Sequence, residues 1–299
     1  MPAEIVLGFV DAEVNRLLDL DTRGEVSLCL VPIGRRSESS PVPKELSALG
    51  LETIPLSQRE VEYPAMLQMH EASSLQSNEE VAQWRGKQPV PPSSVPANEL
   101  VHLQPLAEQE QPKYTIEQVI LRRGSTRTCD RTAYITLAQL STILDCATRG
   151  LRADFLEPPG GQLNDLYVIV NSVQGLKPGA YFLRREQSTL ELLKEGLFRA
   201  EAYHLGLEQE RPAEACVDIF FLANLKSILE RYGNRGYRAV QLEAGAIGGK
   251  MYLAAYAQRL GATGLTFFDD DVVNFFLPHA EHKCAIFLLA IGELSEEQV

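Results

Sequence analysis

Four short, uninterrupted apolar runs dominate the C-terminal half of the chain. They are LYVIV from Leu166, AYFL from Ala180, VDIFFLA from Val217 and CAIFLLAI from Cys284. Runs of this length without polar alternation are typical of strands buried on both faces under helices. The first two runs are joined by NSVQGLKPG, whose Gly and Pro residues suit a turn between antiparallel strands. The pattern predicts an α+β fold with a central, mostly antiparallel sheet covered by helices.

Two helices are predicted ahead of these strands, and each begins with a capping box. TIEQVILRR starts at Thr115 with Gln118 three residues on, and TLAQLSTILDCATRG starts at Thr136 with Gln139 three residues on. In such a pair, the hydroxyl and the glutamine side chain satisfy free N–H groups of the first turn. The second helix also spaces apolar residues along one face, as a helix that covers a core does. These residues are Leu137, Leu140, Ile143 and Leu144.

A long helix is predicted over Tyr237–Gly261, although its sequence contains internal glycines. Glycine in a helix interior costs about 1 kcal/mol relative to alanine, so these positions need another reason. Gly245, Gly248 and Gly249 combine with neighbouring alanines into a surface of small side chains. Two interpretations stay open, which are close packing of another helix or backbone and direct contact with a flat ligand.

Residues 35–114 differ in composition from the rest of the chain. They are rich in Ser, Pro, Glu and Gln and contain few apolar runs, which predicts a largely irregular linker. A short helix is possible around Asn78–Trp84, and the single tryptophan of the chain, Trp84, is a candidate for docking this linker onto a domain.

The first residues of the chain repeat its last ones. LGFVDAEVNRLLDLDTRGEVSLCLVPIG (Leu7–Gly34) aligns without a gap on LTFFDDDVVNFFLPHAEHKCAIFLLAIG (Leu265–Gly292). Both copies read as a turn, a short helix that an aspartate (Asp11 or Asp269) can cap, a charged loop and a buried strand. The beginning of the chain therefore resembles the end of a domain.

Composition and charge narrow the classes of function. The chain has 299 residues, is 45% hydrophobic and carries a formal net charge of −12, which argues against a broad basic surface for nucleic acid or acidic lipid. No apolar stretch approaches the roughly 20 residues that span a bilayer, and no signal-peptide pattern occurs, so a cytoplasmic location is expected.

The cysteines and histidines favour no disulfide framework and no metal site. None of the five cysteines forms a CxxC pair, and several lie in apolar runs where a free thiol packs as a small hydrophobe. The histidines lack thiol or acidic partners at ligand spacing. The residues concerned are Cys29, Cys129, Cys146, Cys216, Cys284, His70, His102, His204, His279 and His282.

An ordered set of motifs over residues 115–293 resembles a known family. The motifs are RRGSTR (Arg122–Arg127), PPGGQLNDLYVIV from Pro158, VQGLKPGAYFL from Val173, NRGYRAVQLEAGAIGGKMYLAAYAQRLGATG from Asn234, and the closing FFDDDVV with its strand. Together they resemble an FMN-dependent, nitroreductase-like fold of the SagB-type (thiazole/oxazole-forming dehydrogenase) subgroup. The opening GFVDAEVNRLL and LVPIG are similar to the end of such a domain.

The resemblance implies a domain organisation and an oligomeric state. Residues 1–34 would be the C-terminal remnant of a first copy, 35–114 a linker, 115–293 the flavin domain and 294–299 a tail, as in a tandem protein that lacks most of its first copy. Family members bind flavin at a dimer interface built on a long central helix. Residues 237–261 are similar to that helix, which implies a homodimer or pseudo-dimer through them.

RRGSTR is a candidate for contacts with FMN, whose phosphate and reduced ring both call for positive charge. By the resemblance, Arg123, Gly124 and Ser125 would contact the phosphate, the ribityl chain or the ring edge, and Arg127 would lie near N1 and O2 of the ring. The plain alternative is a solvated helix C-terminus, at which basic side chains complement the dipole and Gly124 ends the helix.

Two further loops match flavin-binding positions of the family. In PPGGQLN, which includes Gly160, the resemblance assigns Gly161, Gln162 and Asn164 to the ring or the substrate; the alternative is an ordinary turn before a strand. GATGLT matches the turn that offers backbone N–H groups to flavin N5, and its alternative is a helix C-cap. Its candidate residues are Gly264, Leu265 and Thr266.

The implied activity is hydride transfer through flavin N5 to or from a small-molecule or peptide substrate, with NAD(P)H as one candidate electron donor. No residue is singled out as catalytic. The family commonly has a histidine after EAG and a glutamine a few residues on, where this chain has Ala246 and Gly249. The turn before the final helix usually carries glycine, as Gly8 does in the first copy, but here Thr266 and Phe267 occupy it, and the bulky Phe267 could crowd the flavin. These departures favour the alternative, a degenerate non-catalytic module for dimerisation or partner binding.

Overall fold

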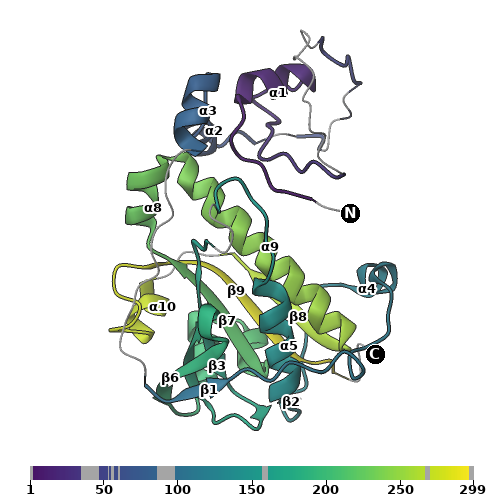
Figure 1. Cartoon of the computed structure of the whole chain (residues 1–299), viewed down its shortest axis with the longest axis vertical. Coiled ribbons are helices and arrows are strands. Elements are labelled where there is room, and N and C mark those ends of the chain that lie inside the picture. The colour runs from purple at the N-terminus through teal and green to yellow at the C-terminus, as the bar shows by residue number, and fades with distance from the viewer. Residues whose placement is uncertain are drawn as a thin grey trace. The chain divides into compact units, whose positions relative to one another are not determined.

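The computed structural model describes residues 3–34, 47–52, 54, 57–59, 61–85, 98–156, 161–266 and 270–295. The chain divides into two compact units. Figure 1 shows the chain coloured by residue number. The first unit comprises Met1–Val90, Leu151–Gly161 and Ser227–Ala239, and the second comprises Pro91–Gly150, Gln162–Lys226 and Val240–Val299. Within the described ranges, no helix is both long enough and apolar enough to cross a membrane.

A seven-stranded sheet is the centre of the second unit. Its strand order is β1-β6-β5-β3-β7-β9-β8, and every neighbouring pair is antiparallel. The strands are β1 (Leu100–His102), β3 (Asp165–Val170), β5 (Gly179–Arg184), β6 (Thr189–Glu195), β7 (Val217–Ala223), β8 (Leu260–Leu265) and β9 (Cys284–Glu293). A separate parallel pair joins β2 (Ile135–Thr136) to β4 (Val173–Gln174). The predicted α+β class with an antiparallel central sheet is confirmed.

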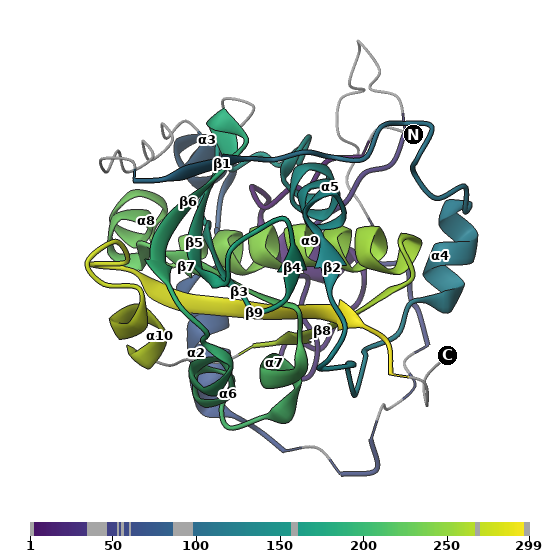
Figure 2. The same ribbon diagram turned by 90° about the horizontal axis from the view of Figure 1, so that it is seen from below.

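Helices cover both faces of this sheet, as Figure 2 shows. On one face α6 and α10 pack against an apolar cluster that includes Tyr167, Phe220 and Leu288 of the sheet. The opposite face carries α5 and α9. The second unit holds α4 (Ile116–Arg122), α5 (Leu137–Thr148), α6 (Arg199–Leu205), α7 (Glu210–Glu214) and α10 (Asp270–Phe275), while α8 (Leu225–Tyr232) and α9 (Arg235–Ala257) have residues in both units.

The local predictions agree with these elements. The four apolar runs form β3, β5, β7 and β9, and β3 pairs with β5 in antiparallel register. Both capping boxes are formed. Thr115 accepts a hydrogen bond from the Gln118 amide at the start of α4, and Thr136 accepts one from the Gln139 amide at the start of α5. Each glutamine side chain bonds back to the N-cap amide, so both predicted helix starts are confirmed.

The predicted end of the long helix is wrong. The helix stops at Ala257 instead of Gly261, because Arg259 takes a left-handed backbone conformation with φ of 62°. Residues 260–265 then form β8, which pairs along β9, so GATGLT is largely strand and neither a turn nor a helix cap. The glycines and the alanine of this segment disfavour a strand, so the sequence pattern did not predict the strand that pairing with β9 stabilises.

The linker prediction is corrected in part. Between residues 35 and 114 the structure describes α2 (Pro64–Ala72), α3 (Asn78–Arg85) and β1, while 35–46 and 86–97 lie outside the described residues. The helix expected around Asn78–Trp84 is confirmed as α3. Trp84 is 4% exposed, and its Nε1 donates to the carbonyl oxygen of Tyr232 at 3.0 Å. The buried side chain of Trp84 therefore anchors α3 within the first unit.

The first unit also contains α1 (Asp11–Leu17), which corresponds in the repeat to α10. Asp11 does not cap α1 as expected, because the N-cap is Val10 and no side-chain cap bond forms. The Asp11 carboxylate instead accepts hydrogen bonds from Arg235, Arg238 and the Leu75 amide. Its counterpart in the second copy, Asp269, lies outside the described residues.

Candidate functional site

The segment RRGSTR leaves the end of α4 and runs along the outer edge of β8. Thr126 fastens it there. Its amide donates to the Ala262 carbonyl at 2.9 Å, and its Oγ1 accepts from the Ala262 amide at 3.0 Å. The same hydroxyl bonds to Tyr256 Oη of α9 at 2.9 Å. Thr126 is buried, whereas Arg122–Ser125 and Arg127 are exposed, so one hydroxyl holds an accessible basic segment against the sheet.

Ser125 lies beside β8, the strand that contains most of the predicted flavin-binding motif GATGLT. Its Oγ is 2.8 Å from Thr263 Oγ1 of β8. Ala262 directs both of its backbone groups toward Thr126 and away from β9. Because backbone groups alternate in direction along a strand, the N–H of Gly264, two residues on, points toward the same outer edge. The structure therefore places an exposed serine hydroxyl and a strand N–H along one edge.

Tyr252 of α9 links Arg123 to Gly264. The guanidinium carbon of Arg123 lies 5.2 Å from the centroid of the Tyr252 ring, and a Cβ at Gly264 would lie 3.3 Å from Tyr252 Oη. An arginine stacked on an aromatic ring is held in place while its N–H donors stay available. The two separate motifs, RRGSTR and GATGLT, thus meet around one tyrosine.

Two further cations gather around Tyr114, and sequence reasoning missed one of them. The guanidinium of Arg122 lies 4.4 Å from the Tyr114 ring centroid, and its Nη2 donates to the Tyr256 carbonyl at 2.5 Å. Arg259 Nε donates to Tyr114 Oη at 2.7 Å. Hydrogen bonds from Arg259 and Arg122 lower the pKa of the Tyr114 hydroxyl. Only its position directly after the helix could have pointed to Arg259.

Gly124 is not explained as a helix cap. The helix ends at Arg122, the following residue Arg123 is extended with φ of −61° and ψ of 125°, and Gly124 takes no positive φ. A Cβ at Gly124 would have only Tyr256 Oη within 4 Å, at 3.6 Å. Open space at this backbone, flanked by guanidinium and hydroxyl donors, fits a bulky anionic group such as a phosphate.

The loop before β3 is held by the buried carboxylate of Glu243, a role that the sequence analysis did not predict. Glu243 Oε2 accepts from the amides of Leu163 and Asn164 at 2.9 and 2.7 Å, and from Asn164 Nδ2 at 2.7 Å. Arg185 Nη1 lies 3.5 Å from Glu243 Oε1. Glu243 is 1% exposed, so it acts on the loop and not on a ligand at the surface.

This network changes the expectation for PPGGQLN. Asn164 is fully buried, so the structure gives its side chain a role in positioning the loop and no access to a ligand. Gln162 is partly exposed, and its Nε2 donates to Asp165 at 3.2 Å. Gly161 is described as part of the first unit, and Gly160 lies outside the described residues.

The remaining GATGLT residues differ in accessibility. A Cβ at Gly264 would meet the Phe287 ring at 2.5 Å, so packing alone demands glycine there. Leu265 packs against the apolar cluster beneath the sheet, which leaves only its backbone for a ligand. Thr266 is exposed, and Phe267, the residue expected to crowd a flavin, lies outside the described residues.

The glycines of α9 divide into two kinds. A Cβ at Gly248 would meet the Phe287 ring of β9 at 2.8 Å, which confirms close packing at that position. At Gly245 and Gly249 nothing lies within 4 Å of a built Cβ, and both residues are exposed. The side of α9 that carries Gly245 and Gly249 therefore presents small residues that no described part of the chain covers.

Comparison with known proteins identifies the family. The model of the nitroreductase family matches residues 120–293, which contain RRGSTR, the loop before β3, α9 and β8. The chain belongs to the nitroreductase family. A nitroreductase-like protein of Methanocaldococcus jannaschii is 28% identical over 190 residues, which cover 60% of this chain and 92% of that relative.

Solved nitroreductase-type structures share the fold. One from Anabaena variabilis has a TM-score of 0.72 at 21% identity and covers 98% of this chain. This chain spans 60% of the length of the Anabaena protein. One from Ralstonia eutropha has a TM-score of 0.51 at 20% identity and covers 70% of this chain and 99% of that one.

The chemistry of the site is that of an anion-binding edge. Its donors are the guanidinium groups of Arg122, Arg123 and Arg259, the hydroxyl of Ser125 and the N–H of Gly264. Among the described residues, no group of three or more His, Cys, Asp and Glu side chains lies together as metal ligands would. These guanidinium, hydroxyl and N–H groups are the kind of donors that bind an organic anion.

Proposed function

We propose that this chain is an FMN-dependent oxidoreductase of the SagB-type (thiazole/oxazole-forming dehydrogenase) subgroup. The observation that carries the proposal is the junction at Tyr252, because Arg123 stacks on this ring and the ring hydroxyl lies 3.3 Å from a Cβ built at Gly264. Both motifs belong to the family-matched region, residues 120–293. A flavin needs cationic donors for its phosphate and a backbone donor near its ring, and this edge offers both.

The exposed donors have distinct tasks in this proposal. Arg123, Gly124 and Ser125 would bind the phosphate or the ribityl chain, and Arg127 would stabilise negative charge on the reduced ring. The backbone groups of Gly264, Leu265 and Thr266 would orient the ring. Gly161 and Gln162 would face the ring or the substrate, and buried Asn164 would hold their loop. FMN would supply hydride transfer at N5, with NAD(P)H or a small-molecule or peptide substrate as the electron donor.

A domain and pairing arrangement forms part of the same proposal. Residues 115–293 would be the flavin domain, and residues 1–34 the C-terminal remnant of a preceding copy. The open side of α9 at Gly245 and Gly249 would receive another nitroreductase domain, either from a second chain in a homodimer or from a tandem copy in a pseudo-dimer. Absence of side chains at those positions lets a facing backbone approach closely.

A second function, a non-catalytic module that pairs with a partner, is favoured by a different observation. Gly249 lies on the open side of α9, Ala246 is partly exposed, and neither offers a polar side chain. A flavin bound against this side would find no hydrogen-bond donor from either residue. In that case the small-residue surface would serve pairing alone.

A flavin titration separates the two functions. We expect the purified chain to bind FMN, to be yellow and to be bleached anaerobically by NAD(P)H or by its own substrate. Arg127→Ala should weaken FMN binding about tenfold or more, since charge-assisted hydrogen bonds contribute roughly 1.5–3 kcal/mol. Arg23→Ala, which removes an exposed arginine of the first unit, is the matched control and should leave the affinity for FMN unchanged. A protein that stays colourless in excess FMN would overturn the flavin proposal and support the non-catalytic function.

A further inference from the structure

Tyr114, which precedes the N-cap of α4, holds two arginines against one ring. The guanidinium carbons of Arg122 and Arg259 lie 4.4 and 5.7 Å from its ring centroid, and Arg259 Nε donates to Tyr114 Oη at 2.7 Å. Both arginines are exposed, and the tyrosine is partly exposed. Figures 1 and 2 place α4 beside the C-terminal end of α9, after which Arg259 follows. These three residues form the Tyr114 cluster.

The Tyr114 cluster carries two like charges without a counter-charge. Within the described residues, no ion pair joins Arg122 or Arg259 to a carboxylate. Arg185 of the same unit, by contrast, lies 3.5 Å from Glu243. Two guanidinium groups on one ring repel each other, and a nearby anion offsets that repulsion. In a chain with a net charge of −12, such a gathering of cations indicates a site for an anionic ligand.

The backbone of Arg259 gives a second, independent reason to expect a ligand. Arg259 takes φ of 62°, a left-handed conformation that glycine or asparagine adopts at helix ends at lower cost. An arginine at this position therefore offers something that glycine cannot, namely its side chain. Its Nε binds Tyr114, and its Nη groups have no hydrogen-bond partner among the described residues.

The donors that stay available in the Tyr114 cluster suit a doubly charged phosphate group. Arg122 uses Nη2 on the Tyr256 carbonyl, which leaves its other N–H groups for a ligand. Tyr114 Oη accepts from Arg259, so its own O–H is left to donate, and hydrogen bonds from the two arginines lower the pKa of this hydroxyl. Exposed guanidinium forks beside a hydroxyl are common partners of phosphate oxygens.

The Tyr114 cluster lies apart from the contacts proposed for FMN. Ser125 Oγ contacts Thr263 Oγ1, and Thr263 is four residues from Arg259, which corresponds to about 13 Å of extended strand. The guanidinium of Arg123 stacks on a different ring, that of Tyr252. A phosphate at Ser125 and a phosphate at the Tyr114 cluster would therefore occupy two different positions.

We propose that the Tyr114 cluster is a second phosphate subsite, which binds the 2′-phosphate of NADPH. NADH lacks this group, so the cluster makes NADPH the preferred electron donor. The inference rests on the proposed function, in which FMN takes the contacts of Arg123 and Ser125 and a nicotinamide nucleotide is the donor. FMN also ends in a phosphate monoester, so the binding of both molecules has to be measured.

Binding of NADP⁺ and NAD⁺ tests the subsite without turnover, because the two oxidised nucleotides differ only in the 2′-phosphate. Isothermal titration calorimetry on the purified full chain, with FMN in excess, should show about tenfold or more tighter binding of NADP⁺, since charge-assisted hydrogen bonds hold the phosphate. Arg259→Gly should bring the two affinities together. Glycine suits the backbone at this position, so the variant is expected to fold. Arg149→Gln, which removes an exposed arginine elsewhere in the second unit, is the matched control and should keep the preference.

Equal or absent binding of the two nucleotides by the parent chain would overturn the subsite, as would a preference for NADP⁺ that survives Arg259→Gly. Absorbance titration of the same samples reports FMN binding separately. A loss of FMN affinity in Arg259→Gly as large as in Arg123→Ala would assign the Tyr114 cluster to the FMN phosphate and overturn the proposal. A chain that prefers NADP⁺ but binds no FMN would support the subsite and refute the flavin part of the proposed function.

Discussion

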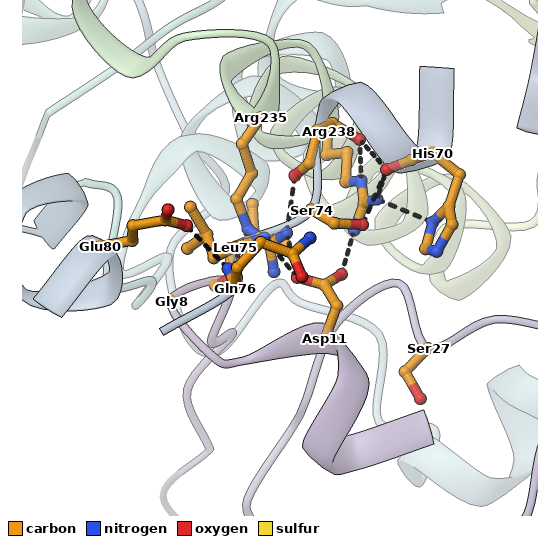
Figure 3. A network of polar contacts seen from close by, with 12 residues as sticks. Gly8, Asp11, Ser27, His70, Ser74, Leu75, Gln76, Glu80, Arg235 and Arg238 are labelled. Carbon is orange, nitrogen blue, oxygen red and sulfur yellow. Dashed lines mark hydrogen bonds and ion pairs between the residues drawn. The ribbon is translucent and has the colours of Figure 1, made fainter. Parts of the chain in front are cut away.

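Arg235 Nη1 donates to Asp11 Oδ2 across 2.7 Å, and both side chains are almost completely buried, at 2% and 3% exposure. Asp11 is the first residue of α1, and Arg235 begins α9. Arg238 Nη1 binds the other carboxylate oxygen at 2.9 Å. One carboxylate therefore joins two arginines of one helix turn to α1 within the first unit, as Figure 3 shows.

Replacing Asp11 with Asn should destabilise the first unit strongly. Two buried or nearly buried guanidinium groups would lose their counter-charge, which costs about 3–5 kcal/mol of unfolding free energy. Trp84, the only tryptophan of the chain, is buried in this unit, so its fluorescence during urea unfolding reports the change. The control is Glu62→Gln, which breaks the exposed pair with Arg23 and should cost at most about 1 kcal/mol. Equal effects would show that the buried network does not support the unit.

Acid should weaken the same network through His70. Burial first, and then the nearby Arg238 charge, lower the pKa of His70 below its usual 6.5. The unfolded chain then takes up the proton before the folded chain does, so unfolding free energy falls as the pH drops through about 6.5 and levels off below the folded pKa. Trp84 fluorescence in urea at pH 7 and pH 5 measures this loss.

The matched variant for this titration is His70→Asn. His70 Nδ1 lies 2.8 Å from Arg238 Nη2, and an asparagine oxygen can take over that hydrogen bond without titrating. The variant should lose clearly less stability between pH 7 and pH 5 than the parent. An unchanged loss would place the titrating group elsewhere.

Replacing Glu243 with Gln should release the loop before β3. The buried carboxylate accepts two backbone amides and Asn164 Nδ2, and an amide can neither accept them all equally well nor balance Arg185. We expect a loss of about 2 kcal/mol or more and faster amide exchange at Leu163 and Asn164. Glu99→Gln, at an exposed pair with Lys177, is the control. Unaltered exchange at those two amides would argue against the positioning role.

Alanine at two neighbouring glycines of α9 should have opposite effects. Gly248→Ala drives a methyl group into the Phe287 ring and should destabilise the protein by about 1–3 kcal/mol. Gly249→Ala meets nothing and should stabilise the isolated chain by up to about 1 kcal/mol through helix propensity. Thermal unfolding of both variants tests the contrast, and a lower melting temperature for Gly249→Ala would show that this position is covered.

Much of the fold follows from local sequence patterns. The apolar runs and the capping boxes at Thr115 and Thr136 were predictable because each depends on residues a few positions apart. RRGSTR and GATGLT were likewise visible as motifs. That they meet at Tyr252 was not visible, since α9 brings this ring between segments far apart in the chain.

The sequence by itself determined the type and place of most elements, because hydrophobic period and helix-start chemistry act over one or two turns. Only the tertiary structure decided that residues 260–265 are a strand, since pairing with β9 outweighs their weak β propensity. Long-range folding also decided the roles of Glu243 and Asp11, because a carboxylate gains its function from the donors that surround it. For the same reason, Leu28, Val31 and Ile33 are exposed, whereas the residues aligned with them, Ile286, Leu289 and Ile291, are buried in β9 between β7 and β8.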